Sequence, residues 1–236
     1  MTAQRILIVV TNSSDYEKVG YRTGLWLSEL THFWDVAEAA GFEMDIASPL
    51  GGYVPIDPES LLLPELIQMT GIKNAVNQRY EDRNFMNLLS HSLKISEVDV
   101  SRYQAIYLTG GHGVMFDFNQ SDALAHTISQ FYESGKLVSA VCHGPCGLLN
   151  VKLSTGDYLI KSKKLTGFSW KEEKLAKRDH AVPFNLEQEL INRGAIYEKA
   201  LLPFSEKVIE DGLLITGQNP KSAHTVAHAV IDRLKH

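Results

Sequence analysis

The sequence predicts an α/β fold with a mostly parallel central sheet, and three features of the chain indicate it. Residues 5–11 (RILIVVT) form a β-branched apolar run before a polar loop, which is typical of a buried parallel strand. A helical pattern over residues 24–40 follows, and residues 42–48 (FEMDIAS) read as a second strand. Two further apolar runs, at 103–109 and Leu137–Val141, supply more strands of the same kind. A strand, a helix and a strand in this order imply a right-handed crossover and a parallel sheet.

Composition limits the classes of protein to which the chain can belong. Its 236 residues, 22% of them charged, suffice for one α/β domain, and we expect a single domain over residues 1–236. A net charge of −5 gives no basic surface for nucleic acid or for an anionic membrane. The longest apolar run near the start, residues 6–10, is too short for a signal peptide or a membrane span. Cys142 and Cys146 lie too close together to close a useful loop, so we expect free thiols and a cytoplasmic location.

The chain is organised around residues 137–149 (LVSAVCHGPCGLL). An apolar strand stops at Cys142. His143 and Gly144 come next, and a helical pattern begins at Cys146. The spacing A-x-C-x-G is typical of a nucleophile elbow, a sharp turn that holds a nucleophile above the sheet. We expect the following helix to stabilise a thiolate through its dipole, and His143 to accept or donate a proton. Cys142 is therefore the predicted nucleophile; a buried core cysteine is the alternative.

Glu29 is the exceptional residue of the 24–40 helix. It follows Trp26 by three residues and precedes Phe33 by four, so it projects from the apolar side of the helix. A carboxylate in that position loses solvation, which raises its pKa unless a partner is present. Glu29 is either a buried functional group or a side chain at the edge of the apolar face that reaches solvent.

A glycine turn, Gly110-Gly111-His112-Gly113, follows the strand at 103–109. Glycine at the carboxyl end of a parallel strand allows backbone amides to approach a ligand. We expect the Gly111 amide, paired with that of His143, to form an oxyanion hole; a tight turn that needs positive φ is the alternative. The turn lacks the G-x-G-x-x-G spacing, so no dinucleotide site is predicted.

The remaining segments complete the predicted topology. Residues 49–101 contain Gly51-Gly52 and several prolines, and we interpret them as an inserted cap or oligomer contact with short helices at 65–69 and 82–89. Predicted helices cover 122–134 after Ser121, 170–177 with polar character, 183–193 opening at Pro183, and 220–234 with Asn219 as N-cap. Predicted strands cover 159–166 and 195–200, and residues 207–216 form a hairpin that turns at Asp211-Gly212.

His224 and His228 lie four residues apart in the last predicted helix, a spacing that suits a metal ion. The glutamate of an H-E-x-x-H motif is absent, and so is a third ligand nearby in the sequence. We interpret the two residues as histidines of a helix face, and we expect no metal site and no cofactor.

Three stretches, in order along the chain, resemble the DJ-1/PfpI superfamily: GLWLSELTHFWD around Glu29, GGHGVMFDF at 110–118 and AVCHGP at 140–145. The similarity extends to TGQNPKSAH at 216–224 and is greatest to the Hsp31-like members, described as glutathione-independent glyoxalases (glyoxalase III) and stress chaperones. The resemblance implies a flavodoxin-like three-layer α/β sandwich and a homodimer.

The same resemblance implies roles for individual residues. Cys142 would be the nucleophile, His143 its neighbour in the elbow, and Glu29 the carboxyl group beside the thiol. Gly111 would match the glycine whose amide helps to form the oxyanion hole. Cys146 departs from the pattern, which has a small residue such as alanine there, and we interpret it as a small core residue rather than a resolving thiol.

The implied reaction converts methylglyoxal and water into lactate without a second thiol, as in a D-lactate dehydratase-type hydro-lyase. The Cys142 thiolate adds to the aldehyde, Glu29 and His143 move protons through an enediol, and hydrolysis of a thioester frees the acid. We assign the C–H proton to Glu29, because one residue can take that proton and return it. The expected partner is a small 2-oxoaldehyde; unfolded client proteins would be the partners of a chaperone.

Other functions use parts of the same pattern. A glutamine amidotransferase needs a distant His-x-Glu, and no histidine of this chain is followed two residues later by glutamate. A cysteine α/β-hydrolase would use His224 or His228 but would leave Glu29 without a role. A protease would need a base placed independently of the elbow. A holdase chaperone or an oxidant sensor, in which Cys142 is oxidised to sulfinate, is the main alternative.

Overall fold

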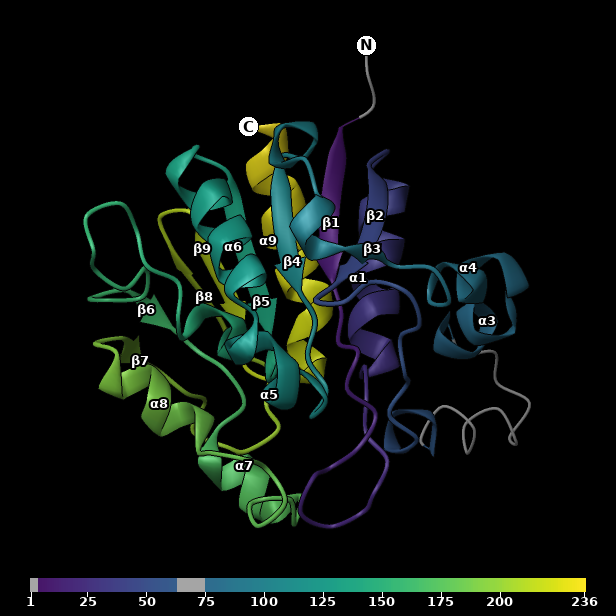
Figure 1. The fold of residues 1–236 in the computed structure, drawn as a ribbon, viewed down its shortest axis with the longest axis vertical. Helices are drawn as coiled ribbons and strands as arrows, with labels where there is room; N and C mark the ends of the chain where they lie inside the picture. The colour runs from purple at the N-terminus through teal and green to yellow at the C-terminus, as the bar shows by residue number, and fades with distance from the viewer. Residues whose placement is uncertain (1–3, 63–74) are drawn as a thin grey trace.

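The computed structural model describes residues 4–62 and 75–236 (Figure 1). Its centre is a seven-stranded sheet with the strand order β3-β2-β1-β4-β5-β9-β8. Neighbouring strands are parallel except β8, which pairs with β9 in the antiparallel direction. The strands are β1 (Arg5–Val9), β2 (Glu43–Ser48), β3 (Leu93–Lys94), β4 (Ala105–Leu108), β5 (Leu137–Val141), β8 (Val208–Asp211) and β9 (Leu214–Gly217). The predicted mostly parallel sheet is confirmed.

Helices cover both faces of this sheet, as in a three-layer sandwich. α1 (Leu27–Ala39) and α9 (Ala223–Lys235) pack side by side on one face; α5 (Val114–Asp117), η3 (Phe118–Gln120) and α6 (Asp122–Glu133) cover the other (Figure 1). Side chains alternate along β1, since Ile6 and Ile8 pack toward α1 and α9 whereas Leu7 and Val9 pack toward α6. Burial of both faces explains why the central strands read as continuous apolar runs.

α1 begins at Leu27, three residues later than the sequence predicts. The preceding residues are extended: the Leu25 N–H donates to Pro55 O at 2.8 Å, and the Asp57 N–H donates to Leu25 O at 2.9 Å. A Cβ at position 24 would lie 2.3 Å from Pro55 O, so only glycine permits this close approach. The late start places Glu29 in the first turn of α1.

The helix predicted after the elbow is a 3-10 helix, η4 (Gly144–Leu148), rather than an α-helix. Its bonds span three residues: the Cys146 N–H donates to His143 O, and the Leu149 N–H donates to Cys146 O. A short 3-10 helix of this kind turns the chain sharply away from the sheet, toward the α6 side.

Two other helix starts also differ from prediction. α8 (Leu186–Asn192) begins after Asn185, whose side chain accepts the Gln188 N–H, so Asn185 rather than Pro183 sets its start. α9 is preceded by η5 (Pro220–Ser222), and the Asn219 side chain makes no cap bond. It donates instead to Glu172 Oε1 at 3.0 Å and to Ser205 O at 2.7 Å.

The 49–101 segment leaves the sheet after β2 and returns at the edge strand β3. Residues 59–62 are helical, and the other described helices of the segment are α3 (Ala75–Glu81), α4 (Arg83–Leu88), η1 (Ile95–Glu97) and η2 (Val100–Arg102). Asp82 caps α4 by accepting the N–H groups of Asn84 and Phe85, so the helix predicted at 82–89 is confirmed. The helix predicted at 65–69 lies outside the described residues. A cap or oligomer role for the segment stays a prediction.

The C-terminal third adds elements beyond the carboxyl ends of the central strands. α7 (Trp170–Leu175) lies there next to α8 (Figure 1). β6 (Lys164–Leu165) and β7 (Ile196–Tyr197) form a separate parallel pair. The β8–β9 hairpin predicted at Asp211-Gly212 is confirmed. In the part of the chain that the structure describes, no helix has the length and the hydropathy needed to span a membrane.

Candidate active site

Cys142 adopts the strained conformation that a nucleophile elbow requires. It follows β5 directly with φ 59°, in the left-handed region that residues other than glycine rarely adopt. Its N–H donates to Gly217 O at 2.9 Å, and its carbonyl oxygen accepts the Phe168 N–H at 2.7 Å. A Cβ at position 144 would lie 2.5 Å from Leu108 O, so only glycine fits there. The A-x-C-x-G pattern therefore has the backbone geometry predicted from it.

Glu29 is buried beside the Cys142 thiol. The residue is 0% exposed, and its Oε2 atom accepts the Gly110 N–H at 2.6 Å. Burial raises the pKa of Glu29 from 4.5 to about 8, against the effects of its hydrogen-bonding neighbours. Glu29 therefore carries a proton at neutral pH. Its other oxygen, Oε1, forms no hydrogen bond to the described residues.

Two consecutive glycines bring the end of β4 against the thiol and Glu29. A Cβ at Gly110 would lie 2.7 Å from Glu29 Oε2 and 2.9 Å from the His143 amide nitrogen. A Cβ at Gly111 would lie 2.2 Å from Gly24 O, and Gly111 has φ 94°. The Gly111 N–H points toward the thiol, where it favours the thiolate. The two amides predicted to form an oxyanion hole thus both border the site; their catalytic role stays a prediction.

The thiol of Cys142 is shielded from solvent, with the residue 3% exposed. Burial raises the pKa of this thiol, the charge of an ionised Glu29 raises it further, and the Gly111 N–H offsets part of the increase. The prediction that the following helix stabilises a free thiolate is therefore wrong. η4 is a 3-10 helix of five residues, whose dipole is too small to outweigh burial. A thiolate forms here when the proton passes to a neighbouring group.

His143 connects Cys142 to a carboxylate. Its Nδ1 atom lies 3.3 Å from Cys142 Sγ, and its Nε2 atom lies 2.8 Å from Glu173 Oε2. Glu173 belongs to α7 and is buried. The carboxylate orients the imidazole and the imidazole faces the thiol, which is the arrangement of a nucleophile, a base and an orienting acid.

Glu173, like His112, is a site residue whose side chain the sequence leaves without a predicted role. The sequence predicts a polar helix at 170–177 and gives Glu173 no role. The spacing of Ser169 and Glu172 is that of a capping box, and the structure contains both hydrogen bonds of this motif. The motif accounts for Glu172 but not for the second glutamate, Glu173. This extra glutamate is the one feature of the sequence that could have pointed to a role for Glu173. The burial of Glu173 depends on contacts with the elbow.

A second imidazole, that of His112, shares the Glu173 carboxylate. Its Nε2 atom lies 2.7 Å from Glu173 Oε1, and its ring centroid lies 4.3 Å from that of His143. Burial alone would raise the pKa of Glu173, but the two imidazoles outweigh burial and hold this pKa well below its usual range. Burial and His112 together lower the pKa of His143. Glu173 is therefore ionised and accepts a hydrogen bond from each ring.

His112, His143 and Glu173 also form the one set of three among the described residues whose metal-binding atoms all lie within 4.8 Å of one another. Both carboxylate oxygens are already paired, at 2.7 and 2.8 Å, with the two Nε2 atoms. An ion would have to displace these hydrogen bonds, so we describe the set as a hydrogen-bonded cluster. The rings of His224 and His228 lie 4.6 Å apart on α9, and no third ligand joins them within the described ranges.

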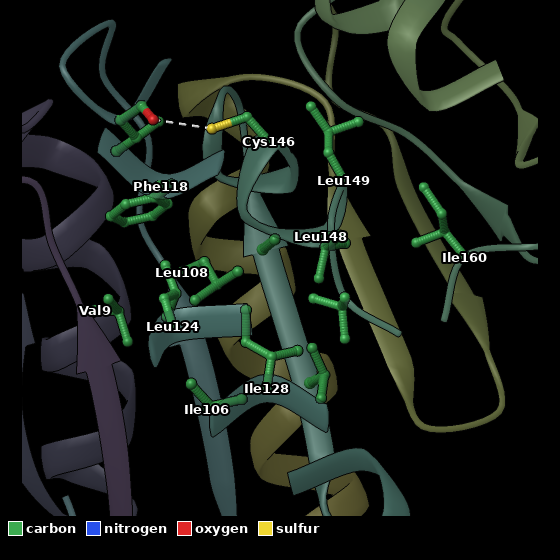
Figure 2. Packing of buried hydrophobic residues seen from close by; sticks show 14 of the residues in the cluster. Val9, Ile106, Leu108, Phe118, Leu124, Ile128, Cys146, Leu148, Leu149 and Ile160 are labelled. Atoms are coloured by element: carbon green, nitrogen blue, oxygen red, sulfur yellow. Dashed lines mark hydrogen bonds between the residues drawn. The ribbon is translucent and has the colours of Figure 1, made fainter. Parts of the chain in front are cut away.

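Cys146 packs on a different side of the sheet from Cys142. Its thiol donates to Val114 O at 3.0 Å and lies near Phe118 and Leu148 in the core cluster on the α6 side (Figure 2). Cys142 belongs to the cluster that packs against α1 and α9. Both cysteines are free. This packing agrees with the interpretation of Cys146 as a small core residue.

Comparison with known proteins establishes the family. The model of the DJ-1/PfpI family matches residues 22–233 of this chain. The chain belongs to the DJ-1/PfpI family. The family expected from the three sequence stretches around Glu29, Gly111 and Cys142 is therefore confirmed.

Relatives of this DJ-1/PfpI chain include fungal glyoxalases. The glutathione-independent glyoxalase Hsp31 of Saccharomyces cerevisiae is 32% identical over 245 residues, with 100% of each chain covered. The crystal structure of glyoxalase III from Candida albicans has a TM-score of 0.84 and 28% identity, over 97% of this chain and 96% of that chain. The rapid encystment protein of 24 kDa from Francisella tularensis has a TM-score of 0.90 and 34% identity, over 98% and 99% of the two chains. The predicted three-layer fold is confirmed by these structures.

Proposed function

We propose that this DJ-1/PfpI chain is a glutathione-independent glyoxalase, which converts a 2-oxoaldehyde such as methylglyoxal, with water, into a 2-hydroxy acid. The observation that carries the proposal is the buried pair of Cys142 and Glu29. Cys142 can add to an aldehyde, and Glu29, with a pKa of about 8, can accept and return a proton near neutral pH. Relatives named as glyoxalases, 32% and 30% identical over nearly their full length, support the proposal.

In the first step the Cys142 sulfur bonds to the aldehyde carbon. The thiol proton passes to Glu29 or to His143 Nδ1, which lies 3.3 Å from Sγ. The carbonyl electron pair moves onto oxygen, where the Gly111 and His143 amides stabilise it, each by about 3 kcal/mol. The group that took the thiol proton returns it to that oxygen, which completes a hemithioacetal and leaves the Glu29 carboxylate ionised.

In the second step a proton moves between the two carbons of the substrate. The ionised Glu29 removes the C–H proton of the hemithioacetal, the electron pair forms a C=C bond, and the electron pair of the ketone moves onto the ketone oxygen. That oxygen takes the proton of the neighbouring hydroxyl group, whose oxygen becomes the carbonyl oxygen of the product thioester. Glu29 then returns the proton to the neighbouring carbon. The aldehyde carbon is thereby oxidised to a thioester and the ketone carbon reduced to an alcohol, so no external oxidant is needed. The Gly110 amide holds Oε2, which leaves Oε1 free for this transfer.

In the last step water hydrolyses the thioester. His143 accepts a proton from the attacking water, and Glu173, at 2.8 Å, holds the imidazole in place. The C–S bond breaks, the thiolate leaves, and it regains its proton from the imidazolium. In the reverse direction the overall reaction removes water from lactate, so we assign the enzyme to the D-lactate dehydratase type of hydro-lyase.

Lactate formation from methylglyoxal without glutathione tests this proposal. We expect wild type to form one lactate per methylglyoxal consumed, and Cys142→Ala to form none above the uncatalysed rate. Cys146→Ala removes the other thiol from a core position and is the matched control, which should retain activity. If wild type forms no lactate, or if Cys142→Ala forms it at the same rate, the proposal is wrong.

A holdase role is the second candidate, and exposed apolar side chains favour it. Leu201 and Leu202, in the loop between β7 and β8, are 98% and 70% exposed. If this loop binds unfolded chains, the double variant Leu201→Ser/Leu202→Ser will lose the ability to suppress aggregation, whereas Cys142→Ala will keep it. Equal suppression by the double variant and wild type would exclude the loop.

Oxidant sensing has less support. Sensor cysteines are accessible thiols with a low pKa, because the thiolate is the form that reacts with oxidants. Cys142 is buried and burial raises the pKa of its thiol.

A further inference from the structure

We infer that His112 is a positioning residue for the reaction at Cys142: it ties the glycine turn at 110–113 to Glu173, and so fixes the Gly111 amide and the His143 imidazole relative to each other. The kinetic part of the test below rests on the proposed function; the spectroscopic part does not.

The backbone of His112 belongs to the turn that carries the Gly111 amide. The turn is held against the start of α1, since the Gly113 N–H donates to Gly24 O at 3.4 Å and the Gly111 position leaves no space for a Cβ. The side chain of His112 reaches in the other direction, to Glu173 Oε1 at 2.7 Å, and is buried. His112 therefore spans from the end of β4 to α7.

The Glu173 carboxylate is held by both of its oxygens. His112 occupies Oε1 and His143 occupies Oε2, so the carboxylate group cannot rotate without breaking a buried hydrogen bond. Without the first of these bonds, Oε1 would be buried and unpaired, and Glu173 could turn away from His143. The His143 ring also lies between two rings, at 4.3 Å from His112 and 4.5 Å from Phe168. His112 thus supplies both an anchor for Glu173 and one wall for the imidazole.

The charged and titratable surroundings give the direction of the expected effect. Groups that face His143 are Glu172 and Glu173 from α7, His112 from the glycine turn, and the Cys142 thiol; Asp57 and Tyr16 face His112. His112 lowers the pKa of His143, whereas the two glutamates raise it. A variant that lacks the His112 ring but keeps Glu173 in place should therefore titrate His143 at higher pH than wild type does. A variant in which Glu173 also turns away should lose the effect of this carboxylate and titrate His143 at lower pH than the first variant.

Two polar substitutions separate positioning from simple packing. In His112→Gln the amide nitrogen stands as many bonds from Cα as imidazole Nε2, so it can still donate to Glu173. In His112→Asn the nitrogen is one bond closer to the backbone and cannot reach. We would measure kcat and KM for methylglyoxal, and in parallel follow the His143 imidazole titration by NMR, with its signal assigned by its loss in His143→Asn.

We expect His112→Asn to lower kcat about tenfold with KM within about twofold, and His112→Gln to restore most of the loss. The His143 titration should lie at higher pH in His112→Gln, which keeps Glu173 in place, than in His112→Asn, in which Glu173 is free to turn away. Equal kcat in all three proteins, or equal losses of kcat in both variants with the same His143 titration in both, would overturn the inference. If wild type has no glyoxalase activity, the proposed function fails, but the NMR titrations still decide the role of His112.

Discussion

The Gly110 amide donates a hydrogen bond of 2.6 Å to Glu29 Oε2, although the two residues lie 81 positions apart in the chain. The bond joins the first turn of α1 to the carboxyl end of β4. It fixes one carboxyl oxygen and leaves Oε1 available to a substrate on Cys142. A neutral amide compensates only part of the cost of burial, which is why the pKa of Glu29 rises to about 8.

The pH dependence of catalysis should follow Glu29. Below about pH 8 Glu29 is protonated and cannot accept the thiol proton or the C–H proton, so kcat/KM should fall as pH is lowered through this value. Glu29→Gln is neutral at every pH, so its residual activity should lack this dependence. The measurement is kcat/KM from roughly pH 6 to 9 for both proteins. If kcat/KM of Glu29→Gln falls in the same way as pH is lowered, a group other than Glu29 causes this dependence.

Glu29 should also make the fold less stable as pH rises. Its pKa is 4.5 for an ordinary glutamate and about 8 in the folded chain, so the folded state holds a proton that the unfolded state releases in this window. This contribution is fully present below about pH 4.5 and is lost as pH rises through about 8. Relative to wild type, Glu29→Gln should gain up to about 4 kcal/mol of unfolding free energy between pH 5 and pH 8. Denaturant unfolding at both pH values measures the gain, and a difference independent of pH would contradict the shifted pKa.

Comparison of Gly111→Ala with Gly156→Ala separates the effect of backbone strain from the effect of a steric clash between the new Cβ and a neighbouring backbone atom. Both glycines have positive φ, 94° and 86°, but a Cβ would lie 2.2 Å from Gly24 O at position 111 and would meet nothing within 4 Å at position 156. Gly156→Ala should cost about 1 kcal/mol of unfolding free energy and leave kcat/KM unchanged. Gly111→Ala should cost more than about 3 kcal/mol and lower kcat/KM at least about 100-fold, because the amide beside the thiol must move. If the two variants lose the same unfolding free energy and both keep the wild-type kcat/KM, Gly111 is needed only for the backbone conformation of its turn.

The adjacent glutamates of α7 should have separable roles. The Glu172 carboxylate accepts hydrogen bonds from Ser169, Phe204, Gln218 and Asn219, and so ties two loops to α7. Glu172→Gln places an NH₂ group against these donors and should cost about 3 kcal/mol, roughly 10 °C in Tm, with kcat/KM little changed below the transition. Glu173→Gln should lower kcat at least about 100-fold, because His143 loses its orienting carboxylate. The measurements are Tm and kcat for both variants. A loss of kcat in Glu172→Gln with normal kcat in Glu173→Gln would exclude Glu173 as the orienting acid.

The parts of the fold that could be predicted are those that local patterns specify. Continuous apolar runs identified β1, β4 and β5, because a strand buried on both faces has no polar side. β2 contains Glu43 and Asp45 and is predicted from its position after the helix at 24–40. The spacing of Asp211-Gly212 identified the β8–β9 hairpin. Helix ends were less accurate: α1 starts late because Leu25 pairs with Pro55, a contact across 30 positions that no local pattern contains.

The site divides in the same way. Cys142 and Glu29 could be singled out because each breaks a local pattern, the first at an elbow and the second on an apolar helix face. Glu173 could not, since a glutamate next to a capping glutamate looks like an ordinary exposed helix residue. Its contacts with His112 and His143 span 61 and 30 positions and exist only in the folded chain. The thiol's pKa depends likewise on burial, which outweighs the helix dipole expected from the sequence.

The most direct test of the proposed mechanism is the rate of lactate formation from methylglyoxal by Glu29→Gln, compared with wild type and Cys142→Ala, without glutathione. The amide keeps the volume of Glu29 and an acceptor for the Gly110 amide but cannot carry the C–H proton. We expect equimolar lactate from wild type, none above background from Cys142→Ala, and lactate formation at least about 100-fold slower than wild type from Glu29→Gln. Lactate formation by Glu29→Gln at the wild-type rate would contradict the mechanism, because another group would then move the proton.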